Sequence, residues 1–457
     1  MTNNRSSFSS RLGFVMAAAG SAVGLGNLWR FPYLAARYGG GIFLFMYIVL
    51  AITFGFALMI AEIAIGRKTR LSCISAYGKL NEKFKFLGGL ASLIPFLIVP
   101  YYCVIGGWVI KYLFEFIMGN GLALTAETYF DNFITVASPG LTNSPMPWFI
   151  LFVGITGVIV LFGVEGGIEK CSKVMMPVLV LLSMFIAIYS CTLPGAKEGI
   201  KYFLLPDFSQ LSIATVLGAM SQLFYSMSLA MGIMITYGSY MQDQDKLEPA
   251  VAQIEIFDTI IAILAGLMII PPVIAFNGGT ADGIVAGPGL MFGVLPKVFQ
   301  TMPGSNFIGF AFFLLVFFAA LTSSISLLET CLSIVQDTLH TSRKVTAVLI
   351  TLVTIAVGTL SCLGYGPLSM IQPLGMAFLD FFDFITNSML MPIVALLTCI
   401  LIGHVVGSDV VSDEVMKNGD RFVMKRMYEV MIRWVAPIIL VFILLGEFAR
   451  YMGWLVI

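Results

Sequence analysis

The chain has 457 residues and no net formal charge, and 59% of its residues are hydrophobic while only 11% are charged. Because ordinary globular domains carry about 25% charged residues, this composition excludes a soluble protein and predicts an all-α protein that crosses the lipid bilayer several times. The balanced charge gives no reason to expect a nucleic-acid partner. The seven cysteines follow neither a metal-binding nor a disulfide spacing.

Eleven apolar runs are long enough to cross a bilayer as helices. We interpret the first run as a retained span, because no small-residue cleavage site follows it. The runs cover residues 11–36, 41–66, 87–118, 147–164, 168–192, 211–241, 249–275, 305–339, 344–363, 380–405 and 428–450.

Lysine and arginine are distributed unevenly among the loops between these runs. If the N-terminus lies inside, the cytoplasmic flanks hold 18 of the 25 residues of these two types. The loop over residues 119–145 contains none of them. Because positive residues favour the cytoplasmic side, we predict a multi-pass protein of the inner (plasma) membrane. Its N-terminus is then cytoplasmic and, with eleven spans, its C-terminus is extracytoplasmic.

The first apolar run contains the segment GSAVGLGNLWRFPY, residues 20–33, which is poor in helix formers. Gly20, Gly24 and Gly26 are soon followed by the charged Arg30. Close helix packing would explain the glycines, but not the arginine, which is costly in lipid unless it faces water or a partner. Because irregular backbone inside a membrane must be buried or line a cavity, we predict a broken helix that forms part of a binding site.

The sixth run is interrupted in a similar way. The segment FYSMSLAMGIMITYGSY, residues 224–240, places Ser226, Ser228 and Gly232 near its centre. Interrupted spans at matching positions of two halves indicate a transporter's midplane site, where half-helix ends bind an anionic group and free carbonyls bind Na⁺. An offset of five spans inverts the topology, so we predict two inverted five-helix repeats. The predicted divisions are 1–192, broken near 22–26, then 193–405, broken near 228–232, and finally 406–457, a cytoplasmic loop with the last span.

Several longer motifs then carry a family resemblance. The stretch RLGFVMAAAGSAVGLGNLWRFPY, followed by GGGIFLFMY, resembles the opening of the neurotransmitter:sodium symporter family. The motifs VPYYCVIGGW, ITYGSY and ALTSSIS follow in family order, so the resemblance covers nearly the whole chain. It is closest to the bacterial, eleven-span members. The resemblance implies the LeuT fold, which has two inverted five-helix repeats and one extra helix.

The resemblance also implies a central amino-acid site. The substrate carboxylate would meet the N–H groups of Leu25 and Gly26 and the hydroxyl of Tyr102. Monoamine carriers of the family have Asp at the position of Gly24, so a glycine there implies a substrate that brings its own carboxylate. The lining is largely apolar, which favours hydrophobic or aromatic amino acids. The implied substrate-binding residues are Ser21, Ala22, Leu25, Gly26, Ile98, Tyr102, Tyr225, Ser226, Ser228, Met231, Ser324 and Leu327.

Two bound Na⁺ ions are implied as well, each in a shell of oxygen ligands. The substrate carboxylate would complete the first shell, which is made by Ala22, Asn27, Ser226 and Asp258. The second shell is made by Gly20, Val23, Ala319, Thr322 and Ser323. Without the resemblance, hydroxyls in a membrane span more often bond to their own helix backbone.

Two gates flank this site in the family. The outer gate would pair Arg30 with Asp383, and Tyr102 and Tyr225 would form an aromatic lid over the substrate. The implied inner pair is Arg5 and Asp337.

Two acidic residues inside apolar runs need an explanation, because a carboxylate in a membrane is costly. Glu62 lies near the cytoplasmic end of its run, and we predict that it hydrogen-bonds to one of the two helix breaks. Asp258 replaces the Asn that many family members have. Chloride-independent relatives usually carry a carboxylate one turn later, at Ala262 here, so Asp258 is expected to supply both a sodium ligand and the missing negative charge.

The sequence therefore predicts a sodium-coupled symporter that takes up hydrophobic or aromatic amino acids by alternating access, without chloride and with proton antiport through Asp258. Two alternatives remain open: a sodium-dependent amino-acid sensor without turnover, and a proton-coupled carrier that lacks the second sodium site. No catalytic triad or phosphate loop indicates an enzyme. The expected partners are an amino acid and the lipid bilayer, with no obligatory protein partner.

Overall fold

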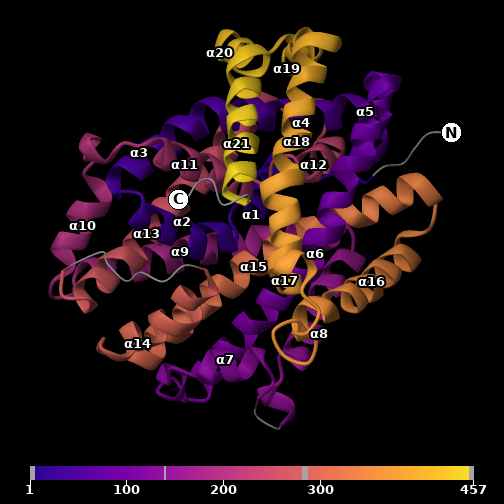
Figure 1. The fold of residues 1–457 in the computed structure, drawn as a ribbon. Coiled ribbons are helices and arrows are strands. Elements are labelled where there is room, and N and C mark those ends of the chain that lie inside the picture. The colour runs from indigo at the N-terminus through magenta and orange to yellow at the C-terminus, as the bar shows by residue number, and fades with distance from the viewer. Residues whose placement is uncertain (1–5, 138–139, 280–286, 452–457) are drawn as a thin grey trace.

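The computed structural model describes residues 6–137, 140–279 and 287–451, and within these ranges the chain is almost entirely helical (Figure 1). The first half contains α1 (Arg11–Ala22), η1 (Gly26–Arg30), α2 (Phe31–Arg37), α3 (Gly41–Leu50), η2 (Ala51–Gly55), α4 (Phe56–Thr69), α5 (Cys73–Leu80), η3 (Glu82–Phe84), α6 (Lys85–Ile117), η4 (Ala123–Thr125), α7 (Tyr129–Ile134), η5 (Leu141–Asn143), α8 (Pro145–Leu161), η6 (Val164–Glu169), α9 (Lys170–Cys191) and α10 (Ala196–Leu204).

The second half continues with η7 (Phe208–Gln210), α11 (Ile213–Ser226), α12 (Ile233–Tyr240), α13 (Leu247–Phe276), η8 (Leu290–Val294), α14 (Leu295–Gln300), α15 (Ser305–Leu339), α16 (Arg343–Leu363), η9 (Pro373–Gly375), α17 (Phe378–Asp383), η10 (Phe384–Leu390), α18 (Met391–Ile400), η11 (Leu401–Val405), α19 (Asp409–Val415), η12 (Lys417–Gly419), α20 (Lys425–Val430), η13 (Met431–Val435) and α21 (Ala436–Tyr451). Several of these elements join end to end into one longer helix, such as α3, η2 and α4.

Eight continuous helices in the described chain are long and apolar enough to cross a membrane, and a bent pair, α1 with η1 and α2, makes up to nine. The predicted fourth and sixth spans instead appear as shorter helices, α8 and the interrupted pair α11 and α12. The predicted count of eleven therefore stays a prediction, whereas a multi-pass, all-helical membrane protein is what the structure has.

The first predicted break is present as an interruption between α1 and η1. Ser10 caps the start of α1 by accepting a hydrogen bond from the Gly13 N–H. The helix ends at Ala22, the backbone is extended at Val23, and the second half departs from the direction of α1 by 47°. The interruption exposes the backbone groups of residues 23–25 to the centre of the molecule.

The second interruption separates α11 from α12 and has a more unusual backbone. Ser228, Ala230 and Gly232 have φ angles of 54°, 60° and 77°, in the left-handed region that non-glycine residues rarely adopt. The fully buried Glu62 on α4 accepts a hydrogen bond of 2.7 Å from the Ala230 N–H. The prediction that Glu62 bonds to a helix break is confirmed, and this side chain satisfies a backbone donor that lipid could not.

Helices α4 and α12 pack with their backbones in contact. A Cβ atom at Gly66 would lie 1.9 Å from the Ile235 carbonyl oxygen, and one at Gly238 would lie 2.3 Å from that of Ile63. Only glycine permits this approach at both positions. The second half of the interrupted span is thus held directly against α4, the helix that also carries Glu62.

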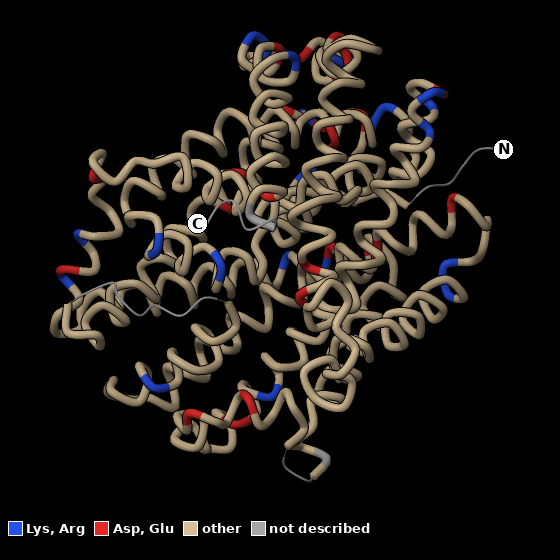
Figure 2. The backbone as a smooth tube through the Cα atoms, viewed as in Figure 1, with Lys and Arg blue, Asp and Glu red and all other residues tan. Residues whose placement is uncertain are grey.

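Charged residues gather at the end of the molecule where α5, α19 and α20 lie, at the top of Figure 2. Arg70 and Lys417 both pair with Asp243, at 2.5 and 2.9 Å. The Lys417 ammonium, with Arg70, lowers the pKa of the Asp243 carboxyl below its usual value. These loops are the ones predicted to be cytoplasmic, and the orientation itself stays a prediction.

Candidate substrate and sodium site

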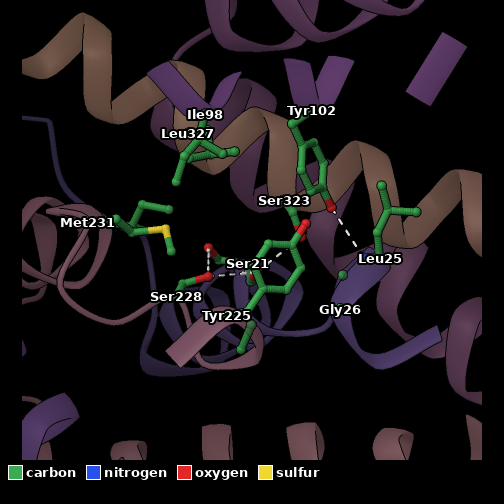
Figure 3. A pocket seen from close by; sticks show the side chains of 13 residues that line it. Ser21, Leu25, Gly26, Ile98, Tyr102, Tyr225, Ser228, Met231, Ser323 and Leu327 are labelled. Carbon is green, nitrogen blue, oxygen red and sulfur yellow. Dashed lines mark hydrogen bonds between the residues drawn. The ribbon is translucent and has the colours of Figure 1, made fainter. Parts of the chain in front are cut away.

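A cavity lies between the two helix interruptions, with α6 and α15 closing its other sides (Figure 3). Both interruptions contribute to it, which is why residues two hundred positions apart meet there. Its lining residues are Ser21, Ala22, Gly24, Leu25, Gly26, Ile98, Tyr102, Tyr225, Ser228, Met231, Ile233, Ser323 and Leu327. Ten of the twelve predicted substrate residues are among them; the exceptions are Ser226 and Ser324.

One side of the cavity is suited to an anionic group. The Leu25 N–H, at the start of the helix that continues into η1, donates to the Tyr102 hydroxyl at 3.3 Å (Figure 3). The first N–H groups of a helix have no partner within the helix and carry the positive end of its dipole. A carboxylate placed between Leu25, Gly26 and Tyr102 would therefore find hydrogen-bond donors on both sides.

The opposite side combines a pair of hydroxyls with apolar side chains. The Ser228 hydroxyl donates to the Ser21 carbonyl at 2.9 Å, and the Ser21 hydroxyl donates to that of Ser228 at 3.1 Å. Ile98, Met231 and Leu327 supply the apolar part (Figure 3). This half of the cavity fits an apolar side chain better than a charged one.

Ser324 does not line the cavity. Its buried hydroxyl shares a hydrogen bond of 2.9 Å with Thr156 on α8 and donates to the Leu321 carbonyl of its own helix. The resemblance identified the helix correctly but not the direction in which this hydroxyl points.

Two glycines let aromatic and polar groups approach the first interruption. A Cβ atom at Gly26 would lie 2.4 Å from the Tyr225 ring, and one at Gly24 would lie 2.6 Å from the Ser323 hydroxyl and 3.0 Å from that of Tyr102. A larger residue at Gly24 would therefore displace the groups that face the cavity. This close packing keeps Tyr225 against the first interruption.

The fully buried Asp258 is the centre of a hydrogen-bond cluster beside the cavity. Its carboxylate accepts from the Asn27 amide at 2.9 Å and from the hydroxyls of Ser226 and Tyr47 at 2.6 Å each. Three of the four residues predicted for the first sodium site thus meet, and the fourth, Ala22, lines the adjacent cavity. The arrangement concentrates oxygen atoms around one negative charge, as a hard cation requires.

The residues predicted for the second sodium site lie where α1 meets α15. A Cβ atom at Gly20 would be 3.2 Å from that of Thr322, so the two helices touch here. The Thr322 hydroxyl bonds to its own helix, at the carbonyls of Phe318 and Ala319. The Ser323 hydroxyl instead reaches across to the Ser21 carbonyl at 3.0 Å, and to that of Gly20 at 3.4 Å.

The predicted outer pair does not meet as an ion pair in the described chain. Arg30 donates to the Ser221 hydroxyl at 2.8 Å, and its guanidinium lies 5.3 Å from the centre of the Tyr225 ring. Asp383 accepts hydrogen bonds from Tyr101 and Asn387. The contact between Arg30 and Asp383 stays a prediction.

Of the predicted inner pair, Arg5 lies outside the described residues. Asp337 accepts a hydrogen bond of 2.6 Å from the Ser72 N–H. Close to the N-terminus, Phe8 is fully buried and packs edge-on against Tyr237 and Tyr240. The segment before α1 therefore closes this end of the molecule.

Sequence reasoning missed two residues of this site. Tyr47 on α3 donates to Asp258, and the Gln222 amide donates to the Gly26 carbonyl at 2.9 Å. Tyr47 ends the motif GGGIFLFMY, and Gln222 lies two residues before the sixth-span motif, so each lies within or close to a recognised motif. Only the rotation of each helix, which the sequence does not give, identifies which face meets the site.

Comparison with known protein families identifies the class to which this protein belongs. The family described as "Sodium:neurotransmitter symporter family" matches residues 5–126 and 123–454, nearly the whole chain. The protein therefore belongs to this family. It is a sodium-dependent transporter of the membrane and not an enzyme.

Relatives of similar length agree with this assignment. The chain is 33% identical to an uncharacterized sodium-dependent transporter of Bacillus subtilis, over 96% of this chain and 97% of the relative. It is 32% identical to another such protein of Methanocaldococcus jannaschii, over 90% and 84% of the two chains.

A solved structure supports the fold. The crystal structure of MhsT in complex with L-phenylalanine matches with a TM-score of 0.87 and 36% identity, covering 97% of this chain and 100% of that one. MhsT has the LeuT fold, so the predicted fold class is confirmed. Sodium coupling follows from the family, and the number of ions does not.

Proposed function

We propose that the protein couples inward movement of Na⁺ to uptake of a hydrophobic or aromatic amino acid by alternating access. The observation that carries this proposal is the cavity between the two helix interruptions. It has hydrogen-bond donors for a carboxylate at Leu25 and Tyr102, and an apolar opposite side formed by Ile98, Met231 and Leu327. That MhsT was solved with L-phenylalanine supports the same class of substrate.

The close surroundings of Gly24 support a substrate with its own carboxylate. An aspartate at this position, as in monoamine carriers, would collide with Ser323 and Tyr102. The substrate must therefore bring the negative charge. Its ammonium group would face the carbonyls near Ala22 and Ser228, at the ends of the interrupted helices.

Two Na⁺ ions are proposed for these positions. The first ion would lie among the Ala22 carbonyl, the Asn27 amide oxygen, the Ser226 hydroxyl and the Asp258 carboxylate. It would also contact the substrate carboxylate. The second would lie between α1 and α15, bound by the carbonyls and hydroxyls of Gly20, Val23, Ala319, Thr322 and Ser323.

Transport is proposed to be independent of chloride. Two Na⁺ ions and a zwitterion in a low-dielectric site need an offsetting negative charge, because like charges repel strongly there. Asp258 supplies that charge, whereas Ala262 one turn later cannot. When the empty carrier returns, a bare buried carboxylate is costly. We therefore propose that Asp258 then carries a proton outward.

The proposed cycle also uses the predicted architecture. The divisions 1–192, 193–405 and 406–457 would act as two inverted repeats and one extra helix, with the N-terminus in the cytoplasm and the C-terminus outside. Arg30 would move from Ser221 toward Asp383 when the outer side closes. Asp337 would act with Arg5 at the inner side.

Uptake of labelled phenylalanine and leucine into proteoliposomes tests this proposal directly. An inward Na⁺ gradient should drive accumulation with gluconate replacing chloride, and acidifying the interior should speed it. Asp258→Asn should keep the site but lose the acceleration by internal acid. A requirement for external chloride, or a wild type indifferent to internal pH, would contradict the role given to Asp258.

The same assay separates the two alternatives. A sensor without turnover would bind the amino acid in a Na⁺-dependent way but accumulate none. A proton-coupled carrier would accumulate it with a proton gradient and no Na⁺. The cross-helix bond of Ser323 favours the sodium symporter, because it directs a hydroxyl at carbonyls of α1 where an ion could bind.

A further inference from the structure

Arg30 also faces a second pocket, away from the central cavity. This pocket lies between α2, α11 and α21, and it contains the side chains of Arg30, Tyr38, Ser221 and Glu447. Its volume is about 60 Å³, enough for several water-sized polar groups. Arg30 and Glu447 give it one positive and one negative side chain.

An apolar groove adjoins this pocket between α11 and α21. It has a volume of about 580 Å³, and every residue that lines it is apolar: Ile213, Val216, Leu217, Met220, Ile439, Phe442, Leu445, Gly446 and Ala449. Ile213, Phe442 and Leu445 are more than half exposed. On a membrane-spanning helix pair, such a surface faces lipid tails.

The pocket and the groove adjoin, because Leu217 and Gly446 line both. A Cβ atom at Gly446 would lie 3.3 Å from the Leu217 side chain, and nothing else is within 4 Å. Glycine inside a helix is unfavourable by about 1 kcal/mol relative to alanine. Here the glycine lets Leu217 approach α21 closely, so that little side-chain volume separates the groove from the pocket.

We propose that the pocket and the adjoining groove together bind one phospholipid with an ethanolamine headgroup. An acyl chain would occupy the groove, the phosphate would accept hydrogen bonds from Arg30, and the primary ammonium would donate to Glu447. Within the described chain, Arg30 makes a single hydrogen bond, to Ser221, although a guanidinium has five N–H donors. Its remaining donors suit phosphate oxygens, which arginine binds in a bidentate manner.

The opposite charges select this headgroup among the common lipids. Phosphatidylglycerol has no cation for Glu447, and the quaternary ammonium of phosphatidylcholine has no N–H to donate. A bound ethanolamine lipid would compete with Asp383 for Arg30. The site thus goes beyond the proposed transport function and would tune the outer gate from the membrane side.

Native mass spectrometry of the purified full-length protein tests the proposal. The probes are phosphatidylethanolamine, phosphatidylcholine and phosphatidylglycerol with identical acyl chains. Because charge-assisted hydrogen bonds are about twice as strong as neutral ones, we expect one ethanolamine lipid to be retained about tenfold more tightly than either of the others. Equal retention of the three lipids would mean that the groove binds acyl chains without selecting a headgroup, and would overturn the proposal.

Substitutions at the junction of the pocket and the groove test where the lipid binds. Gly446→Leu should fill the junction of the pocket and the groove, and Glu447→Gln should remove the negative partner of the ammonium. Each variant should abolish the preference. Gly154→Leu on α8, where an added Cβ meets nothing, is the matched control and should keep it. Na⁺-dependent phenylalanine binding checks that each variant is folded.

Retention of no lipid by the wild type, or an unchanged lipid preference in Gly446→Leu, would show that the proposed site is wrong.

Discussion

The two proposed sodium sites differ in how their oxygens are held. At the first site, Asp258 already accepts three hydrogen bonds, from three different helical elements. At the second site, Thr322 bonds within its own helix, and only the hydroxyl of Ser323 connects α15 to α1. The first site is thus built into the fold, whereas the second depends on how α1 lies against α15.

Replacing Asp258 with alanine should have the largest effect on this comparison. The substitution leaves the buried donors of Asn27, Ser226 and Tyr47 without their acceptor, and each buried donor left unsatisfied costs about 1–3 kcal/mol. We expect a large loss of thermal stability in detergent together with complete loss of Na⁺-dependent phenylalanine binding. A variant as stable as the wild type would mean that the hydrogen-bond cluster around Asp258 does not stabilise the fold.

The second site should respond differently, with function lost and stability kept. Thr322→Val with Ser323→Ala removes two hydroxyls at nearly constant volume. Na⁺-driven uptake should be lost, while the free energy of unfolding falls by only about 1 kcal/mol for the one cross-helix bond. The single variant Thr322→Val should leave the free energy of unfolding unchanged, and Ser323→Ala should account for its fall in the double variant. Normal uptake by the double variant would show that the hydroxyls serve the helix alone.

Gly26→Ala tests how closely the residues beside the first sodium site are packed. The added methyl would overlap the Tyr225 ring, and overpacking typically costs about 1–3 kcal/mol. We expect apparent phenylalanine affinity to fall by about tenfold, measured by equilibrium binding at saturating Na⁺. The matched control, Gly154→Ala, should bind as the wild type does. Unchanged affinity in Gly26→Ala would mean that Tyr225 moves freely.

An ion pair outside both sites should give the smallest effect. The pKa of Asp243 is lowered by Lys417 and Arg70, so its stabilisation is present above the carboxyl's ordinary value of 3.8 and is lost as the pH falls through the lowered folded value. Because the pair is exposed, Asp243→Asn should cost less than about 1 kcal/mol at pH 7. Thermal unfolding of the variant and the wild type should show a smaller difference at pH 3 than at pH 7.

The sequence predicted those features that depend on local chemistry. Helix-poor glycines and serines inside apolar runs indicated both interruptions, and the cost of a buried carboxylate indicated that Glu62 and Asp258 must have partners. Features that depend on helix rotation were not predictable. Tyr47 reaches Asp258, and Ser324 turns toward Thr156, because of how α3 and α15 are rotated in the assembled bundle.

The length and number of spans were harder to predict for a related reason. Hydropathy counts apolar residues but does not show where a helix bends or stops. The predicted fourth and sixth spans correspond to the shorter helix α8 and to the interrupted pair α11 and α12, so the count of eleven stays a prediction. Connecting helices such as α7 and α10 are too short to give a strong apolar signal. Their positions follow from the fold as a whole.

The continuous helix made by α3, η2 and α4 touches both halves of the site. Tyr47 near one end bonds to Asp258, and Glu62 near the other bonds to the Ala230 N–H of the second interruption. Fifteen residues of helix separate them, or about 22 Å at 1.5 Å per residue. This one helix therefore makes contacts with both parts of the site. We therefore expect a rearrangement that displaces Tyr47 also to act on Glu62, which would couple the proposed first sodium site to the second interruption.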